Sequence, residues 1–334
     1  MVLDRSIGMV LEAINVTKEY KIQQKGKSRL RNIFAPQYKS LVAVDDLSFS
    51  ISKGETVGYI GLNGAGKSTT IKLLTGILTP TKGDVKLFGE DISKNKMDKN
   101  RRISVVFGQR SNLWYDLPVI DSYNYIKELY GVSSERYKKN LEMVCDCLEI
   151  ENLLQRPVRK LSLGQKMKCE LGVALLYDAE ILFLDEPTIG MDIFVRDNFI
   201  NCIQEMRKKT NTTIFLTTHN MEEVDKLCDR IIVLDKGKLL FDGNAEQIRK
   251  IVGDFQQISF ILADNSKVGD EDIYDKYIVE KKGNDFIKLN IDKNEVNTAD
   301  IMKHFFTKYE VKDVNIENSS LEQLIKQLYK GEGQ

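Results

Sequence analysis

A glycine-rich stretch near residue 60 has the residue types and spacing of a phosphate-binding loop. It reads Gly61-Leu62-Asn63-Gly64-Ala65-Gly66-Lys67-Ser68-Thr69 and fits the pattern G-x-x-x-x-G-K-[ST]. Glycines let the backbone turn its N–H groups toward phosphate oxygens, and the start of a following helix adds partial positive charge. In this arrangement the Lys67 ammonium reaches the outer phosphates and the Ser68 hydroxyl ligates Mg²⁺. The stretch therefore predicts a nucleotide phosphate site.

Two adjacent carboxylates follow an apolar run much later in the chain. Residues 181–184 are Ile-Leu-Phe-Leu, which predicts a buried strand with Asp185 at its tip. Asp185 is expected to hold Mg²⁺ through water, as the metal-binding carboxylate of a phosphate site does. Glu186 is placed to polarise a water molecule against the γ-phosphate, and Pro187 prevents the strand from continuing.

Gln109 and His219 are single polar residues that each follow another expected strand. In open parallel sheets, ligands gather outside the carboxyl ends of the strands. Four strands are therefore expected to deliver the following side chains to one edge: Gly61, Gln109, Asp185 with Glu186, and His219. We predict that this edge is the site of the chemistry.

The elements that must position these residues can be read from the hydrophobic pattern. From residue 56 onward short apolar strands alternate with helical segments, which predicts a parallel sheet covered by helices. The expected strands are residues 57–60, 103–107, 181–184, 213–216 and 231–234. Alternation at residues 10–16 and 42–51 predicts an antiparallel sheet, and residues 112–177 are expected to form an inserted helical subdomain.

A basic insertion at about residues 21–40 interrupts the antiparallel part. It carries these cations and no carboxylate between them: Lys21, Lys25, Lys27, Arg29, Arg31 and Lys39. Leu30, Ile33 and Phe34 have the spacing of one face of a short helix. Two interpretations stay open, a solvated surface loop and a basic amphipathic contact with lipid headgroups or a membrane partner.

The sequence changes character after residue 243, and we expect two domains, residues 1–245 and residues 246–334. Strands at 258–262, 287–291 and 311–316, with helices at 299–306 and from 321, predict a small C-terminal α+β domain. The last helix has apolar residues at i, i+3, i+4 and i+7, so it is expected to pack on a sheet: Leu321, Leu324, Ile325 and Leu328.

Composition restricts the class of protein. Lys and Arg total 49, as do Asp and Glu, so no overall field recruits nucleic acid, and no nucleic-acid partner is expected. The longest apolar runs are strand-sized, far short of the ~20 residues of a transmembrane helix. The five cysteines fit no zinc or disulfide spacing, which favours a reduced cytosolic protein, and no targeting segment is recognised.

The pentapeptide Leu161-Ser162-Leu163-Gly164-Gln165 resembles the LSGGQ signature of ABC ATPases. It stands before the second phosphate-site strand, as that family requires, with Leu163 where the family usually has glycine. Gln109 resembles the Q-loop glutamine of the family, Asp192 its D-loop aspartate and His219 its switch histidine. The resemblance covers roughly residues 10–243 and implies an α/β fold, a P-loop ABC ATPase with a mixed sheet core.

The resemblance also implies ATP and Mg²⁺ as cofactors. The implied catalytic residues are Lys67, Glu186 and His219, and the implied Mg²⁺ ligands are Ser68, Gln109 and Asp185. ATP contacts are implied for Tyr20, Gly61, Asn63, Gly64, Ala65, Gly66, Lys67, Ser68, Thr69 and Gln109. Tyr20 would stack on adenine, although Phe34 or Tyr38 could take that role, because stacking tolerates any aromatic ring.

The family also implies partners. Ser162, Gly164, Gln165 and Asp192 would contact ATP bound by a second subunit in a head-to-tail dimer. The dimer would couple ATP hydrolysis to export through separate membrane permease subunits. The ATPase subunits themselves would attach peripherally at the cytoplasmic side of the membrane. Two alternatives are a soluble ABC ATPase that acts on ribosomes or nucleic acid, and an ATP-gated regulatory module. The C-terminal domain would serve packing or dimerisation, or bind a regulatory ligand.

Overall fold

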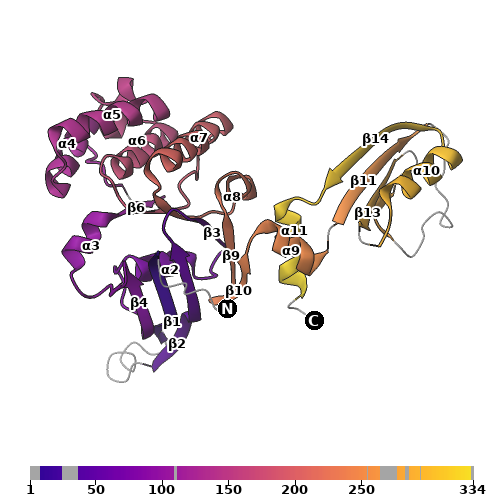
Figure 1. The fold of residues 1–334 in the computed structure, drawn as a ribbon, viewed down its shortest axis with the longest axis horizontal. Helices are drawn as coiled ribbons and strands as arrows, with labels where there is room; N and C mark the ends of the chain where they lie inside the picture. The colour runs from indigo at the N-terminus through magenta and orange to yellow at the C-terminus, as the bar shows by residue number, and fades with distance from the viewer. Residues whose placement is uncertain are drawn as a thin grey trace. The chain divides into compact units, whose positions relative to one another are not determined.

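The computed structural model describes residues 8–24, 37–108, 111–253, 255–263, 277–282, 286–293 and 295–331. The chain divides into two compact units, Met1–Asp242 and Gly243–Gln334, and each is described by itself (Figure 1). None of the helices in the described ranges is both long and apolar enough to cross a membrane.

The larger unit is built on a six-stranded sheet with the order β10-β9-β3-β8-β7-β6. Its strands are β3 (Thr56–Gly61), β6 (Ile103–Phe107), β7 (Ile181–Asp185), β8 (Thr213–Thr217), β9 (Arg230–Asp235) and β10 (Lys238–Gly243). The pairs β3–β8, β3–β9, β6–β7 and β7–β8 are parallel. The carboxyl ends of β3, β6, β7 and β8 therefore lie at one edge of the sheet, as the sequence predicts.

A second, antiparallel sheet has the order β2-β1-β4-β5. Its strands are β1 (Met9–Gln24), β2 (Gln37–Ser52), β4 (Lys82–Leu87) and β5 (Glu90–Asp91). Between the two sheets the rings of Phe49, Tyr59, Phe183 and Phe215 lie in contact, with centroids 4.9 Å apart for Tyr59 and Phe215. These buried rings fix the two sheets against each other.

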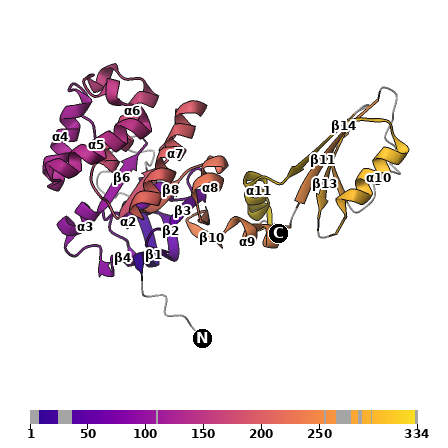
Figure 2. The ribbon, with the colours of Figure 1, turned by 45° about the horizontal axis from the view of Figure 1, so that its top comes forward.

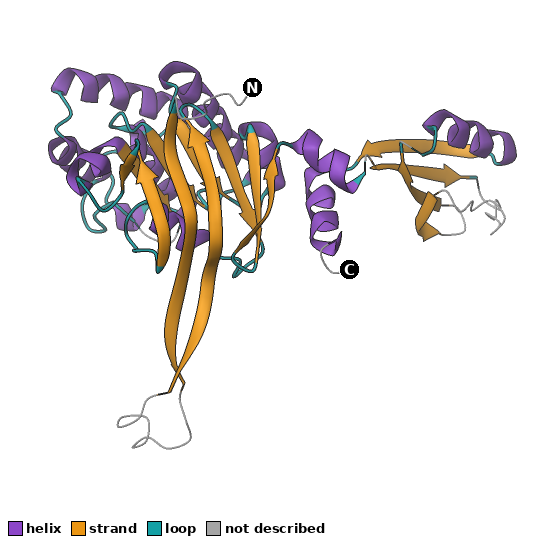
Figure 3. Ribbon diagram, turned by 60° about the horizontal axis from the view of Figure 1, so that its bottom comes forward, coloured by secondary structure: helices purple, strands orange, loops and turns teal. Residues whose placement is uncertain are grey.

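The strands β1 and β2 are longer than the alternation predicts. Pairing of β1 with β4 ends at Thr17 opposite Lys82, whereas pairing with β2 continues to Gln24 opposite Gln37. The result is a two-stranded ribbon, visible in Figure 3, with its backbone groups paired across the two strands. The flanks of the basic insertion are thus strands. The predicted helix with Leu30, Ile33 and Phe34 falls outside the described residues.

Helices cover the parallel sheet, and several of them form the helical subdomain that lies between β6 and β7 (Figure 2). They are α2 (Lys67–Leu74), α3 (Lys96–Arg102), α4 (Val119–Tyr130), α5 (Ser134–Leu148), α6 (Leu163–Leu175), α7 (Ile193–Thr210) and α8 (Met221–Leu227). Short 3₁₀ turns occur at Glu151–Leu153 and Val158–Lys160. The apolar faces of α4, α5, α6 and α7 share one core with β7 and β8.

The smaller unit has a four-stranded antiparallel sheet of order β12-β13-β11-β14. Its elements are α9 (Ala245–Val252), β11 (Phe255–Leu262), β12 (Tyr277–Lys282), β13 (Phe286–Asp292), α10 (Thr298–Lys308), β14 (Val311–Asn318) and α11 (Leu321–Gly331). Helix α10 packs on the sheet, where Phe305 stacks on Phe260 at 4.3 Å between centroids.

The sequence pattern does not predict α9 or β12 of the smaller unit. It does predict a buried apolar face on α11, but that face packs against α9 and not, as expected, on a sheet. Periodicity reveals which face of a helix is buried, but it does not reveal the partner that buries it.

The smaller unit offers a test of its core through two adjacent aromatic residues. Phe305 is fully buried, and Phe306 next to it is 53% exposed. Phe305→Ala should lower the free energy of unfolding of this unit by about 3–5 kcal/mol, because it removes a packed ring. Phe306→Ala should change it by less than about 0.5 kcal/mol. Urea unfolding followed by hydrogen exchange of the β11 amides measures both, and equal effects would contradict the assigned core.

Candidate functional site

The glycine-rich loop runs from the end of β3 to the start of α2. Gly64 and Gly66 have φ values of 85° and 105°, in the left-handed region that favours glycine. At Gly66 an added Cβ would lie 2.4 Å from the backbone oxygen of Ala43, so the position has no room for a side chain. The loop backbone can adopt this path only because these positions are glycine.

A buried hydrogen bond joins the two elements that flank the loop. The Tyr59 hydroxyl in β3 donates to Oγ1 of Thr70 in α2 at 3.0 Å. Burial raises the pKa of the Tyr59 phenol well above its ordinary value, so this hydroxyl stays protonated and remains a donor. The bond fixes the strand that enters the loop against the helix that leaves it.

Lys67 lies beneath the loop with 7% of its surface exposed. Its Nζ donates to the backbone oxygens of Gly61 at 2.7 Å and Leu62 at 3.4 Å. Burial lowers the pKa of the Lys67 ammonium, and the nearby carboxylates of Glu186 and Asp185 oppose that shift. Carbonyl oxygens of the loop and the nearby carboxylates thus surround the ammonium.

Asp185 lies at the end of β7, where two hydroxyl groups approach the same carboxylate oxygen. Thr217 Oγ1 donates to Asp185 Oδ1 at 2.6 Å, and Ser68 Oγ lies 3.5 Å from that atom. Ser68 belongs to the first turn of α2, so the loop helix and the β7 strand end meet here. Hydroxyl and carboxylate oxygens are the ligands that Mg²⁺ prefers, and this pair fits such an ion.

Glu186 is held between the loop lysine and the histidine. Its Oε1 lies 4.0 Å from Lys67 Nζ, and its Oε2 lies 4.0 Å from His219 Nδ1. Its backbone is left-handed, with φ at 51°, an uncommon conformation for a residue other than glycine. The Glu186 N–H donates to the backbone oxygen of Thr217 at 2.9 Å, which holds this conformation. His219 is largely exposed, and Gln109 lies outside the described residues.

A buried carboxylate that the sequence pattern does not predict joins the loops that follow β7 and β8. Glu223 in α8 is fully buried and accepts hydrogen bonds from the hydroxyls of Thr188 and Thr218, the latter at 2.8 Å. Arg196 Nε lies 3.7 Å from the same carboxylate. Thr218 precedes His219 and Thr188 follows Pro187, so Glu223 joins the two loops. In the sequence, the only indication of this role is that polar residues, Thr188 and Thr218, follow the two strands.

The signature pentapeptide begins α6 with a capping box. Ser162 Oγ accepts from Gln165 N at 3.3 Å, and Gln165 Oε1 accepts from Ser162 N at 3.1 Å. Leu163 is exposed, and its side chain lies against Gly190, because a Cβ added at Gly190 would be 2.4 Å from Leu163 Cδ2. Asp192 caps α7 by accepting from Val195 N at 2.9 Å.

The remaining predicted contacts lie near the loop or on the ribbon. Asn63 and Gly64 are exposed, Ala65 is buried, and Thr69 is half-buried. Tyr20 lies on β1 in the ribbon, partly exposed, with Lys18 Nζ 5.6 Å from its ring centroid. Of its two competitors, Tyr38 is exposed on β2, and Phe34 falls outside the described residues.

A cavity of about 440 Å³ lies at the sheet edge. It is lined by Asn63, Ser68, Lys72, Phe107, Gly108, Asp185, Glu186 and Ile189. The structure therefore brings the loop, the β6 end and the two carboxylates to one cavity. The signature residues Ser162, Gly164 and Gln165, together with Asp192, do not line it.

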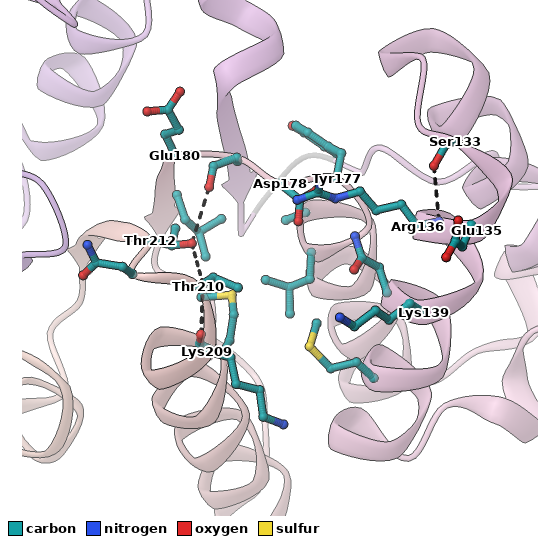
Figure 4. Close-up of a pocket in the computed structure, with 18 of the residues that line it drawn as sticks. Ser133, Glu135, Arg136, Lys139, Tyr177, Asp178, Glu180, Lys209, Thr210 and Thr212 are labelled. Atoms are coloured by element: carbon teal, nitrogen blue, oxygen red, sulfur yellow. Dashed lines mark hydrogen bonds and ion pairs between the residues drawn. The ribbon is translucent and has the colours of Figure 1, made fainter.

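A larger cavity of about 1040 Å³ lies between α5, α7 and the segment before β7 (Figure 4). Basic and acidic side chains line it together, including the ion pair of Arg136 with Asp178 and the side chains of Glu135 and Lys139. None of the sequence motifs contributes to its lining. Size alone therefore does not identify the reactive site, and the smaller cavity carries the convergent chemistry.

Three comparisons with known proteins agree with this geometry. A family model described as "ABC transporter" matches residues 44–189. The ABC transporter ATP-binding protein NatA of Bacillus subtilis is 33% identical over 64% of this chain and 87% of its own. The Nod factor export ATP-binding protein I of Cupriavidus pinatubonensis is 34% identical over 64% of this chain and 65% of its own.

Longer proteins and solved structures also match. This chain covers only 25% of ABC transporter A family member 9 of Dictyostelium discoideum, at 37% identity over 64% of this chain. A dimeric ATP-binding cassette in a post-hydrolysis state, bound to ADP and Pi, superposes with a TM-score of 0.59. It is 23% identical over 70% of this chain and 98% of that chain, which establishes the fold.

The loop geometry predicts opposite outcomes for two glycines. Gly66→Ala should lower the free energy of unfolding by at least about 1–3 kcal/mol, because alanine is strained at its positive φ and would contact Ala43. Gly164→Ala should not destabilise, because its helical position has open space and alanine is favoured by about 0.5–1 kcal/mol in a helix. Urea unfolding of both variants measures this difference, and a stable Gly66→Ala protein would contradict the loop geometry.

Proposed function

The chain belongs to the family of ABC transporter ATP-binding subunits, and on that basis we propose that it works as half of a head-to-tail dimer that powers a separate membrane permease. As a member of this family it binds ATP and is an ATPase. The observation that carries the mechanism is the convergence of Lys67, Asp185, Glu186 and His219 at one sheet edge.

The proposed metal site takes its oxygen atoms from the first turn of α2 and from residues that end or follow β7 and β6 in the sequence. Ser68 and Asp185 would hold Mg²⁺, the carboxylate of Asp185 acting through water, with Gln109 as a further ligand. The support is the short distance between Ser68 Oγ and Asp185 Oδ1, 3.5 Å. Bound Mg²⁺ would supply positive charge that offsets charge on the β- and γ-phosphates.

Hydrolysis in this proposal proceeds through Glu186 as general base. Its carboxylate accepts a proton from water as the water oxygen attacks the γ-phosphorus and the bond to the β-phosphate oxygen breaks. Lys67 neutralises charge on the outer phosphates, and His219 donates a hydrogen bond to a γ-phosphate oxygen. The 4.0 Å spacings of Glu186 from Lys67 and from His219 support these roles.

A second subunit would complete the site. Ser162, Gly164, Gln165 and Asp192 do not line the cavity of their own chain, so they would close over ATP bound by the partner. Several apolar side chains within or next to these motifs and the glycine-rich loop in the sequence are exposed: Leu62, Leu163, Ile189, Ile193 and Phe194. Such a surface is typical of an interface. The dimeric state named for the ADP-bound structural neighbour supports a dimer of this chain.

The partner beyond the dimer would be a membrane permease in an export system. NatA and the Nod factor export protein are ATP-binding proteins of transport systems, and the second is named for export. The subunit would then lie peripherally at the cytoplasmic side of the membrane. The equal numbers of basic and acidic residues favour this role over a ribosome- or nucleic-acid-binding ATPase. The assembled carboxylates and histidine favour turnover over a purely ATP-gated regulatory module.

The smaller unit would act as an accessory domain. It has its own sheet, its own core and the α9–α11 helix pair, which suits a module that packs against a partner subunit or strengthens the dimer. Domain boundaries fall where few contacts cross, and the compact units divide at Asp242 and Gly243.

The assignment of Glu186 as general base predicts a loss of ATP hydrolysis without a loss of ATP binding. Glu186→Gln should retain ATP binding while reducing kcat roughly 10²- to 10⁴-fold, because a positioned general base contributes about that factor. Glu222→Gln removes an exposed carboxylate of the nearby helix α8 and should leave kcat unchanged. Phosphate release and fluorescent-nucleotide binding measure the two quantities. Unchanged hydrolysis in Glu186→Gln would exclude this role.

The dimer proposal predicts that the apolar surface beside the signature matters. Phe194 is 81% exposed, and Phe194→Ser should reduce ATP-driven dimer formation at least about tenfold, because an interface aromatic contributes more than about 1.4 kcal/mol. Met97→Ser, at a 73% exposed residue of α3, serves as the matched control. Light scattering of both variants with ATP, in the Glu186→Gln background, measures dimerisation. Full dimerisation of Phe194→Ser would contradict this surface.

A further inference from the structure

A buried carboxylate in α6 has no role in the chemistry proposed above. Glu170 is 1% exposed, two helical turns beyond the signature residues that begin the same helix. Its Oε2 accepts from Asn112 N at 2.9 Å, and its Oε1 accepts from Leu113 N at 3.4 Å and from the Ser111 hydroxyl. All three donors belong to the segment that follows Gln109.

The position would suit an apolar residue if its only role were packing. Burial raises the pKa of the Glu170 carboxyl, whereas the hydrogen bonds from Ser111, Asn112 and Leu113 favour the ionised form. A carboxylate with two acceptor oxygens can hold two backbone N–H groups and a hydroxyl at once, which no apolar side chain can do. The Glu170 carboxylate is therefore suited to hold residues 111–113 by hydrogen bonds.

The described residues that flank positions 109 and 110 in the sequence are held by different parts of the larger unit. On one side Gly108 N donates to the backbone oxygen of Asp185 at 2.9 Å, which attaches it to the end of β7. On the other side Glu170 holds Asn112 and Leu113 on α6. Trp114 N donates to Ser122 Oγ in α4 at 2.9 Å, so this side belongs to the helical subdomain.

We propose that Glu170 is a positioning residue that makes the chain after Gln109 and the signature helix move as one body. A displacement of residues 111–113 would then carry Ser162 to Gln165 with it, and a displacement of the signature would reach residues 111–113 in turn. This inference rests on the proposed dimer mechanism, and it adds the link between its two motifs.

The chain offers a matched control for a purely structural effect. The Tyr123 hydroxyl donates to the backbone oxygen of Cys169 at 2.8 Å, a buried hydrogen bond from α4 to the residue beside Glu170. Tyr123→Phe removes this bond and keeps the ring, yet leaves the segment after Gln109 attached. Glu170→Gln keeps the size of the side chain but loses one of its two acceptor oxygens.

The experiment separates binding from turnover in the full chain. We expect Glu170→Gln to lower kcat and ATP-driven dimerisation about tenfold or more, because hydrogen bonds to a charged group are lost, with the ATP Kd of the monomer changed less than about twofold. Tyr123→Phe should change kcat less than about twofold, even if its melting temperature falls as far as that of Glu170→Gln. Ser111→Ala, which removes one of the three donors, should give an intermediate kcat.

The outcomes distinguish this inference from the mechanism on which it rests. Wild-type protein that hydrolyses ATP without ATP-driven dimerisation would overturn the proposed function. If wild type dimerises but Glu170→Gln has the same kcat as Tyr123→Phe, the link through Glu170 is wrong. If Glu170→Gln does not fold, Ser111→Ala decides: a normal kcat and normal dimerisation in that variant would overturn the inference.

Discussion

The register between β7 and β8 is the constraint on which the proposed phosphate site depends. Asp185 pairs with Thr217 in this parallel ladder, and Tyr59 of β3 pairs with Thr217 from the other side. The pairing brings the Thr217 hydroxyl to the Asp185 carboxylate and the Thr217 carbonyl to the Glu186 N–H. A slip of one residue would turn Asp185 to the opposite face of the sheet and separate all of these groups.

Aromatic side chains that take no part in the proposed chemistry stabilise this register by packing between the strands. The rings of Phe183 and Phe215 lie on β7 and β8, in contact with each other, and Phe215 also contacts Tyr59 of β3. Three adjacent strands are thereby fixed through side chains as well as backbone hydrogen bonds. The packing of these three strands explains how Glu186 can keep a left-handed backbone, since such strain persists only where the surrounding structure fixes it.

The sequence predicts the site strands well, because most of their residues are apolar and buried. β6 begins and ends where expected, and β7 and β8 extend the expected strands by one residue each. Glu223 could not be found in this way, since its partners Thr188 and Thr218 come from two loops that only the folded sheet brings together. The ribbon was missed because its residues lack clear alternation, and cross-strand pairing supplies the order instead.

The signature helix explains why leucine can replace a glycine in its motif. The capping box joins Ser162 and Gln165 to each other, while the first backbone N–H groups of any helix have no acceptor within it. The Leu163 side chain lies on Gly190, and a side chain at position 163 removes none of the backbone N–H groups. Gly190 has a φ of 76°, so glycine is favoured there for its backbone as well as for its lack of a side chain. The leucine therefore alters the contact between two motifs and preserves the donors, whose acceptor, in the proposed dimer, belongs to ATP on the other subunit.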